Sequence, residues 1–161
     1  MAAQNKYRRI LYSEVQKKMI AKFIEQITNE KIIDLAKAVQ IGDDHFLPTE
    51  TQKKYMKRGP CFIGLHLGSY KNGIFEPSNW LLQKILQAKD AKKAVLNKKQ
   101  AWLFVCGRDI PLTKINELTG KTGDTILVIN ERKECLGYGI AKEDALKNVY
   151  DIGMQMSHNE Q

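Results

Sequence analysis

The sequence has 161 residues and a mass of 18.4 kDa, enough for one ordinary domain or two small ones. Its hydrophobic fraction of 43% and charged fraction of 27% exclude a fully disordered chain. No apolar run approaches the roughly 20 residues of a membrane-spanning helix, and residues 1–30 lack the apolar core of a signal peptide. The sequence therefore predicts a soluble intracellular protein with no membrane partner.

The charge balance of the chain is basic. Lys and Arg number 26 against 18 Asp and Glu, which gives a formal net charge of +8 and a sequence pI near 9.3. This excess favours a polyanionic partner, nucleic acid above all, although a solvated lysine-rich surface would give the same numbers. The excess is uneven: residues 1–90 hold 15 basic and 9 acidic side chains, hence +6, and residues 91–161 hold 11 and 9, hence +2.

The spacing of cysteine and histidine predicts neither a disulfide framework nor a metal site, since both need closely spaced pairs. The three cysteines lie far apart, at Cys61, Cys106 and Cys135. Their apolar or small neighbours predict that they are buried free thiols. The histidines are isolated too, at His45, His66 and His158. We therefore expect no metal and no cofactor.

The first predicted helix covers Ser13–Thr28. Its first residue and Gln16 fit a capping box, and apolar residues follow at helical spacing. A second helix is expected over Lys31–Val39, although the β-branched pair Ile32–Ile33 leaves a strand open. Gly42–Asp44 predicts a turn.

The rest of the first half mixes short strands and short helices. In chain order we expect a strand fragment at His45–Leu47, a helical stretch from Pro48–Thr49 to Gly59–Pro60, a strand at Cys61–Leu67, a turn at Ser69–Gly73 and a helix over Trp80–Leu86 capped by Ser78. A polar junction follows at Lys89–Lys93. We place a domain boundary there, near Asp90, between domains 1–90 and 91–161.

The second half changes character. Its predicted elements are a short strand start at Ala94–Leu96, a polar corner at Lys98–Lys99, an apolar helix over Ala101–Val105 that runs into Gly107, a turn at Gly123–Asp124, and a hairpin of strands Thr125–Ile129 and Cys135–Ile140 around the charged turn Glu131–Lys133. Beyond the hairpin we expect little more than a short helix.

The glycines of Gly137–Gly139 follow a strand, as in a dinucleotide-binding fingerprint. That fingerprint needs a third glycine where this sequence has Lys142, and an acidic residue farther on. A bulge or a close backbone contact in a barrel strand explains the pair better. The sequence has no phosphate-binding loop, no nucleophile beside a base and no metal-binding signature, so we predict no enzymatic activity.

Residues Lys98 to Gly139 resemble a PUA domain, a compact pseudo-barrel that binds RNA and is named after pseudouridine synthases and archaeosine transglycosylases. The run Lys98–Ile110 (KKQAWLFVCGRDI) looks like its first helix, while Gly123–Val128 (GDTILV) and Leu136–Ala141 (LGYGIA) resemble its hairpin. Asp151–Gly153 is similar to the closing segment before its last strand.

The first half narrows the resemblance. An N-terminal amphipathic helix, the run Arg58–Gly64 (RGPCFIG) and a small domain ahead of the PUA domain are similar to the nuclear import protein seven family of large-subunit ribosome biogenesis factors. The sequence departs from the family pattern at Leu65–Gly68, where the family is richer in Lys and Thr, and at Ser157, where an arginine is common. The resemblance implies an α+β fold, with a small N-terminal α/β pre-PUA-like domain and a C-terminal PUA pseudo-β-barrel.

The resemblance also implies an RNA site. At Gly107 the missing Cβ would let a phosphate or sugar approach the backbone, and Arg108 supplies a planar fork of donors, unless it pairs with Asp109 or a helix end. Tyr138 could stack on a base, but a core position is favoured. The expected RNA-binding residues are Lys98, Lys99, Gly107, Arg108, Arg132, Lys133 and Lys142. A possible secondary basic surface comprises Lys53, Lys54, Lys57 and Arg58.

The implied function is that of a non-catalytic RNA-binding adaptor in large-subunit assembly and pre-rRNA processing. Its partners would be RNA, above all ribosomal RNA, and pre-ribosomal assembly proteins, and we expect a monomer. The protein would lie in the cytoplasm if archaeal and in the nucleus or nucleolus if eukaryotic. Two alternatives stay open: an accessory protein that presents tRNA or rRNA to a separate modifying enzyme, and a protein-interaction module whose basic charge is incidental.

Overall fold

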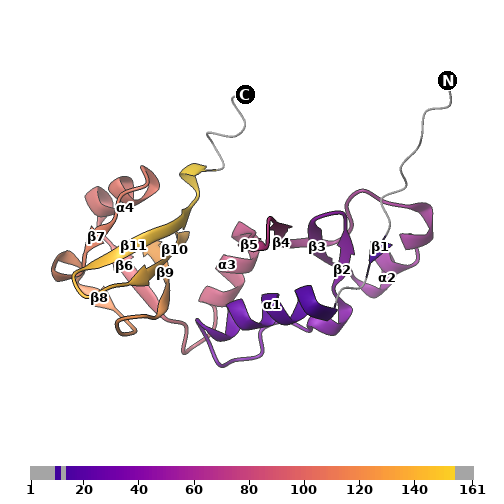
Figure 1. Ribbon diagram of the computed structural model, residues 1–161, viewed down its shortest axis with the longest axis horizontal. Coiled ribbons are helices and arrows are strands. Elements are labelled where there is room, and N and C mark those ends of the chain that lie inside the picture. Colours follow the sequence, from indigo (N-terminus) through magenta and orange to yellow (C-terminus); the bar gives the residue numbers. More distant parts are fainter. Residues whose placement is uncertain (1–9, 12–13, 155–161) are drawn as a thin grey trace, which may run out of the picture. The chain divides into compact units, whose positions relative to one another are not determined.

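The computed structural model describes residues 10–11 and 14–154 (Figure 1). The predicted cap Ser13, and also Ser157 and His158, lie outside the described residues. The elements follow in the order β1 (Ile10–Leu11), α1 (Glu14–Glu25), η1 (Leu35–Lys37), β2 (Val39–Ile41), β3 (Asp44–Leu47), α2 (Glu50–Lys53), η2 (Met56–Arg58), β4 (Leu65–Lys71), β5 (Ile74–Pro77), α3 (Asn79–Leu86), β6 (Lys93–Leu96), α4 (Lys98–Val105), β7 (Ile110–Pro111), η3 (Leu112–Lys114), β8 (Glu117–Leu118), β9 (Thr125–Asn130), β10 (Cys135–Ala141) and β11 (Ala145–Asp151), where η marks a 3-10 turn.

The chain divides into two units, and each unit takes two parts of the sequence. Unit 1 holds the described residues of Met1–Lys22 together with Ile33–Leu81. Unit 2 holds Phe23–Ile32 and Leu82–Gln161, described as far as Met154. The chain therefore passes between the units at three points of the sequence. The predicted division near Asp90 into domains 1–90 and 91–161 stays a prediction.

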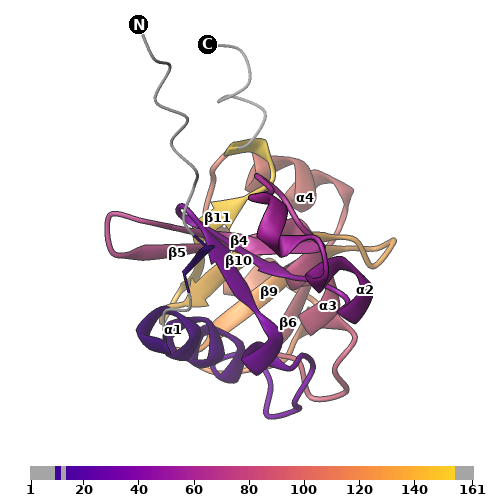
Figure 2. The same cartoon turned by 90° about the vertical axis from the view of Figure 1, so that its right-hand side faces the viewer.

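Unit 1 is built on a five-stranded antiparallel sheet in which strands adjacent in sequence are adjacent in space, from β1 to β5. Strands β4 and β5 lie side by side as a hairpin (Figure 2). They meet in a two-residue turn at Asn72 and Gly73, with φ of 51° and 76°. Positive φ at both positions suits the right-handed twist of the flanking strands. The buried apolar cluster of the unit comprises Val39, Ile41, Phe46 and Ile63, with Met56 packed against it.

Several local predictions for the first half are confirmed. The first helix is present, although it ends at Glu25, before the predicted Thr28. The strand at His45–Leu47 and the helical stretch that ends at Gly59 are also present. Ser78 caps α3, since its Oγ accepts a hydrogen bond of 3.1 Å from the backbone N–H of Leu81.

Two predictions for the first half are wrong. Residues 31–39 form no α-helix, because Asp34 caps a single 3-10 turn and Val39–Ile41 pairs with β3 as a strand. The strand predicted at Cys61–Leu67 begins only at Leu65 and runs through Lys71, so that most of the predicted turn is strand. Gly64 ends the irregular segment with a φ of 73°, which an extended strand does not allow.

Unit 2 is a six-stranded sheet that curls into a half-barrel, in the order β7–β11–β10–β9–β6–β8 (Figure 1). Strand β6 runs parallel to β9, and the other strand pairs are antiparallel. Its apolar core comprises Ala94, Leu96, Phe104, Ile110, Ile126, Val128, Leu136, Ala141 and Leu146, so α4 contributes Phe104 to the core. The predicted α+β class, with an N-terminal α/β part and a C-terminal pseudo-barrel, is confirmed.

The second half matches its predicted hairpin and adds one strand. Strands β9 and β10 form the hairpin around the predicted turn. Lys98 and Lys99 are no corner but the first turn of α4, because Asn97 before them and Gln100 after them form a capping box. Strand β11, which pairs with both β10 and β7, was not predicted, while the short helix expected near the end of the chain begins after that strand, at residues 153–154.

The cysteines differ from the prediction. Cys61 and Cys106 are exposed, because one lies in the irregular segment before β4 and the other is the C-cap of α4. Cys135 alone is partly buried. Burial raises the pKa of the Cys135 thiol to about 11, and a backbone hydrogen bond with Gly137 offsets only part of that rise.

The paired glycines of β10 have the structural role predicted for them. The register of β10 against β11 shifts between Tyr138 and Gly139, which marks a bulge. A Cβ at Gly137 would overlap the carbonyl oxygen of Tyr150, and one at Gly139 would overlap that of Lys147. The two strands therefore approach more closely than side chains at these positions would permit.

Replacing Gly137 with alanine should destabilise the protein by about 2–4 kcal/mol, because the new methyl group meets the backbone of β11 at a φ of 149°. Gly123→Ala is the matched control: φ is 92°, but no atom lies within 4 Å of the added Cβ. Its cost should be about 1 kcal/mol of backbone strain. Urea unfolding of both variants measures the difference, and equal losses would contradict the close approach.

Candidate nucleic-acid interface

Helix α4 is fixed at its N-terminal end by a capping box. The Oδ1 of Asn97 accepts a hydrogen bond of 2.9 Å from the N–H of Gln100, whose Oε1 accepts one of 3.0 Å from the N–H of Asn97. The buried Gln100 side chain also donates to the carbonyl oxygen of Lys114. Lys98 and Lys99 are therefore exposed side chains on the first turn of a well-held helix.

The C-terminal end of α4 closes in a Schellman motif. The N–H of Gly107 donates to the carbonyl oxygen of Phe104 (2.9 Å), and the N–H of Arg108 donates to that of Leu103 (3.1 Å). Gly107 has a φ of 81°, so this helix end requires glycine whatever binds beside it. No atom lies within 4 Å of a Cβ built at Gly107, which leaves its outer side open to a ligand.

Asn148 of β11 holds the loop that follows α4. Its Nδ2 donates to the carbonyl oxygen of Phe104 (2.7 Å) and to Oδ2 of Asp151 (2.9 Å). Its backbone N–H donates to Oδ1 of Asp109 (2.8 Å). Among the described residues Arg108 has no ion pair within 4.0 Å, so the alternative of an Arg108–Asp109 pair is not found. The Arg108 side chain is exposed.

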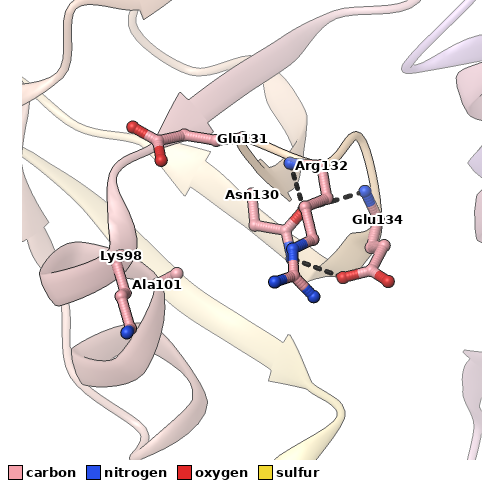
Figure 3. Close-up of a pocket in the computed structure, with 6 residues that line it drawn as sticks. All are labelled: Lys98, Ala101, Asn130, Glu131, Arg132 and Glu134. Atoms are coloured by element: carbon pink, nitrogen blue, oxygen red, sulfur yellow. Dashed lines mark hydrogen bonds between the residues drawn. The ribbon is translucent and has the colours of Figure 1, made fainter.

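The hairpin loop between β9 and β10 lies beside the start of α4 (Figure 3). The Oδ1 of Asn130 accepts hydrogen bonds of 3.0 Å from the N–H groups of Arg132 and Glu134, which fixes the loop. A shallow pocket of about 370 Å³ is lined by Lys98, Ala101, Asn130, Glu131, Arg132 and Glu134. Its two cations are balanced by two carboxylates, so the pocket alone is not an anion site.

The strand register shows which predicted residues lie together. Leu96 of β6 pairs with Asn130 of β9, so the start of α4 and the hairpin loop lie at one end of the sheet. At that end a Cβ added at Gly153, which follows β11, would overlap the carbonyl oxygen of Val105, so the C-terminal turn of α4 lies there too. Lys142 follows the other end of β10, a seven-residue strand about 20 Å long.

The predicted RNA-binding residues therefore fall into three places. Lys98, Lys99, Gly107, Arg108 and Arg132 share the α4 end of the sheet. Lys133 has a φ of 63° and lines a second pocket, with Lys93, Glu117 and Glu131 among its neighbours. Lys142 lies at the opposite end. The sequence-predicted secondary surface of Lys53, Lys54, Lys57 and Arg58 belongs to α2 and η2 of unit 1.

Trp102 was not predicted as a site residue, yet its side chain is 65% exposed on α4. It follows Lys98 by four residues and Lys99 by three, and Cys106 comes four residues later, so all lie on one helix face. We name Lys98, Lys99, Trp102, Gly107 and Arg108 the α4 surface. The sequence holds no Asp or Glu between Asp90 and Asp109, a signal that could have indicated this surface.

Tyr138 is half-buried and belongs to an aromatic cluster. Its ring makes an edge contact with Phe23 at 5.1 Å between centroids and stacks against Tyr150 at 6.0 Å. These neighbours favour the core alternative for Tyr138 over a base-stacking role. No group of three or more His, Cys, Asp or Glu in the described part of the chain could hold a metal ion. None of the described helices is both long enough and apolar enough to span a membrane.

The sequence was compared with models of protein families and with curated proteins. Residues 92–158 match the model of the UPF0113 PUA domain family. No match was found among the curated proteins.

Three solved structures share the fold at low sequence identity. A hypothetical protein of the hyperthermophilic archaeon Pyrococcus horikoshii OT3 has a TM-score of 0.56 and 15% identity, covering 89% of this chain and 93% of that protein. A PUA domain of Aeropyrum pernix K1 has a TM-score of 0.55 and 12% identity, covering 90% and 88%. A conserved PUA domain protein of Thermoplasma acidophilum has a TM-score of 0.52 and 14% identity, covering 94% and 99%. The C-terminal part of this chain thus matches a PUA domain, and the described chain has the fold of PUA-domain proteins.

Proposed function

We propose that this chain binds RNA through the α4 surface. A PUA domain points to RNA as the ligand. The observation that carries the proposal is the exposed face of α4, where Lys98, Lys99 and Arg108 flank Trp102 in a stretch without acidic residues. Cations neutralise phosphates and an exposed indole stacks on an unpaired base, the combination that single-stranded RNA requires.

The dimensions of the surface suit a short run of nucleotides. Eight helical residues span about 12 Å, which corresponds to three or four stacked nucleotides at about 3.4 Å each. The lysines lie at the positive end of the helix dipole, where an anion is favoured. The open side of Gly107 and the guanidinium of Arg108 supply contacts at the other end.

The biological role that we propose is that of a non-catalytic adaptor in large-subunit assembly and pre-rRNA processing. It rests on the resemblance of the sequence to the nuclear import protein seven family, with ribosomal RNA and pre-ribosomal assembly proteins as partners. An accessory protein that presents tRNA or rRNA to a modifying enzyme is the competing role. Crosslinking in cells, followed by sequencing of the bound RNA, separates the two by the class of RNA recovered.

Replacing Arg108 with alanine should lower the affinity for single-stranded RNA by about 5-fold to 150-fold, because a bidentate contact worth roughly 1–3 kcal/mol is lost. Lys142→Ala is the matched control, since it also removes one exposed cation but at the opposite end of β10. Gel shifts at several salt concentrations measure both effects, and affinity should fall steeply with salt.

Both variants must first show an unchanged far-ultraviolet spectrum and melting temperature. Equal losses from Arg108→Ala and Lys142→Ala would contradict a localised site. If Arg108→Ala leaves the affinity intact while joint replacement of Lys53, Lys54 and Lys57 abolishes it, the RNA surface lies on unit 1. Binding that is absent or indifferent to salt would favour the protein-interaction module.

Bound RNA should protect Cys106 from maleimide. This exposed thiol is on the Trp102 face of α4 and next to Gly107, so RNA on the α4 surface would cover it. Cys135 is the internal reference, because its raised pKa leaves almost no thiolate at neutral pH and its labelling should be slow with or without RNA. Mass spectrometry of labelled peptides measures the ratio, and unchanged labelling of Cys106 under saturating RNA would contradict the proposal.

Asn148 is a positioning residue for the α4 surface. Asn148→Asp removes two N–H donors and sets a carboxylate against the buried Asp151, so the variant should lose about 2–4 kcal/mol of stability. Asn72→Asp makes the same chemical change on an exposed turn and should cost little. Urea unfolding measures the stability of both variants. Any RNA affinity lost in Asn148→Asp should return in Asn148→Gln only if the longer side chain lets the amide reach the carbonyl oxygen of Phe104. Equal stability of the two Asp variants would contradict the positioning role.

A further inference from the structure

The longest stretch of the sequence without Asp or Glu lies in unit 1, between Glu50 and Glu76. It contains five cations, at Lys53, Lys54, Lys57, Arg58 and Lys71. Lys53 forms an ion pair, since its Nζ lies 3.0 Å from Oε1 of Glu50. The side chains of Lys54, Lys57 and Arg58 are exposed. Uncompensated positive charge is therefore concentrated over α2 and η2.

Two exposed aromatic rings lie among these cations. Tyr55 is 52% exposed, and the guanidinium carbon of Arg58 is 5.2 Å from the centre of its ring. This cation–π contact orders the arginine over one side of the tyrosine. Phe62 is 65% exposed, more than is usual for so large an apolar side chain.

The fold holds Phe62 in its exposed position. Its neighbour Ile63 is buried in the apolar cluster of unit 1, and Gly64 lies so close to Leu47 that a Cβ would overlap its carbonyl oxygen. The Phe62 ring makes an edge contact with Phe46, at 4.7 Å between centroids, and most of the ring remains open. Phe62 therefore cannot turn inward without dislodging the segment.

The segment that carries Tyr55 is held by the same cluster. Met56 packs against the cluster that contains Phe46 and Ile63, so the Tyr55–Arg58 pair and Phe62 extend from one apolar base. His66, which is near Phe62, is engaged elsewhere: its Nε2 lies 3.0 Å from Oδ1 of Asp44. With His66 occupied by Asp44, the groups of this segment that stay exposed are two aromatic rings and three cations, all within residues 54–62.

We propose that Tyr55, Arg58 and Phe62, together with Lys54 and Lys57, form a second RNA-binding surface that takes unpaired bases by stacking. Every base has a flat aromatic face, so exposed rings bind single strands with little regard to sequence, and flanking cations meet the phosphates. Paired bases are covered by their neighbours and cannot reach the rings. This surface lies in unit 1 and is separate from the α4 surface of the proposed function.

The test compares variants by the anisotropy of a labelled oligouridylate of about 12 nucleotides, a length within the usual range of such sites. Phe62→Leu keeps the apolar contact with Phe46 but removes the stacking face. It should weaken binding by about 5-fold or more at every salt concentration, with the salt slope unchanged. Phe62→Trp should retain the affinity. Val15→Ala, at a side chain that is 70% exposed on α1, is the control and should bind as the unmodified protein does.

Joint replacement of Lys54 and Lys57 by glutamine should act differently. It should flatten the slope of log affinity against log salt by about 1.4, because two phosphate contacts to a single strand are lost. Each change is also made in the Arg108→Ala background, where the effects should persist because the surfaces are separate. Phe62→Leu binding like Val15→Ala in both backgrounds would overturn the second surface, and so would a Phe62→Leu effect confined to the salt slope.

Maleimide footprinting then distinguishes the two surfaces in one experiment. Cys61 is exposed beside Phe62, and Cys106 is exposed beside Gly107. Protection of both thiols by the oligouridylate supports both surfaces. Protection of Cys106 alone overturns the second surface and leaves the proposed function standing, whereas protection of Cys61 alone does the reverse. Protection of neither thiol, together with absent binding, overturns both.

Discussion

The amide side chain of Asn148 joins the elements that shape the candidate site. Its Nδ2 reaches the last turn of α4 at Phe104 and the end of β11 at Asp151. Its backbone N–H reaches Asp109, just before β7. A helix end, a loop and a strand end thus depend on one residue, and a side chain without two N–H donors would lose the contacts to Phe104 and Asp151. The contact with Phe104 therefore also holds the helix end from which Gly107 and Arg108 follow.

Asn148 can occupy that position only because β11 lies close against β10. The backbone of β11 fills the space where Gly137 and Gly139 lack a Cβ, and the register shifts beside them. A bulge of this kind increases the local twist, so the sheet curls into a half-barrel instead of lying flat. Gly137 and Gly139, which resemble part of a cofactor fingerprint, therefore have a structural role. They let β11 lie close to β10, and β11 carries the Asn148 that holds the end of α4.

The α4 surface and the surface around Phe62 combine the same two features, positive charge and an exposed aromatic ring. Each lies in a long stretch without acidic residues and presents a large aromatic ring that the fold holds outward. In α4 the helix period sets Trp102 opposite the buried Phe104, whereas in unit 1 the buried Ile63 holds its neighbour outward. Two single-strand surfaces on one chain would raise the affinity for an RNA that reaches both, without any new contact.

The sequence by itself determined the elements whose signals are local. The cap at Ser78, the helix after Lys99 and the hairpin of β9 and β10 each depend on residues within a few positions of one another. The same is true of the charge excess and of the glycine cap at the end of α4. Five of the predicted RNA-binding residues also came together at one end of the sheet, because a single helix and a single hairpin loop carry them.

Only the tertiary structure decided the features that depend on distant partners. Strand β11 forms because β10 and β7 offer pairing groups on both sides, although its own sequence shows no strong alternation. Residues 39–41 became a strand for the same reason. The exposure of Trp102, Phe62 and Cys106 could not be read from residue type, because burial is set by whichever elements pack against a side chain. Apolar residues are buried only where the fold packs enough neighbours around them, and at these positions most of each side chain stays exposed.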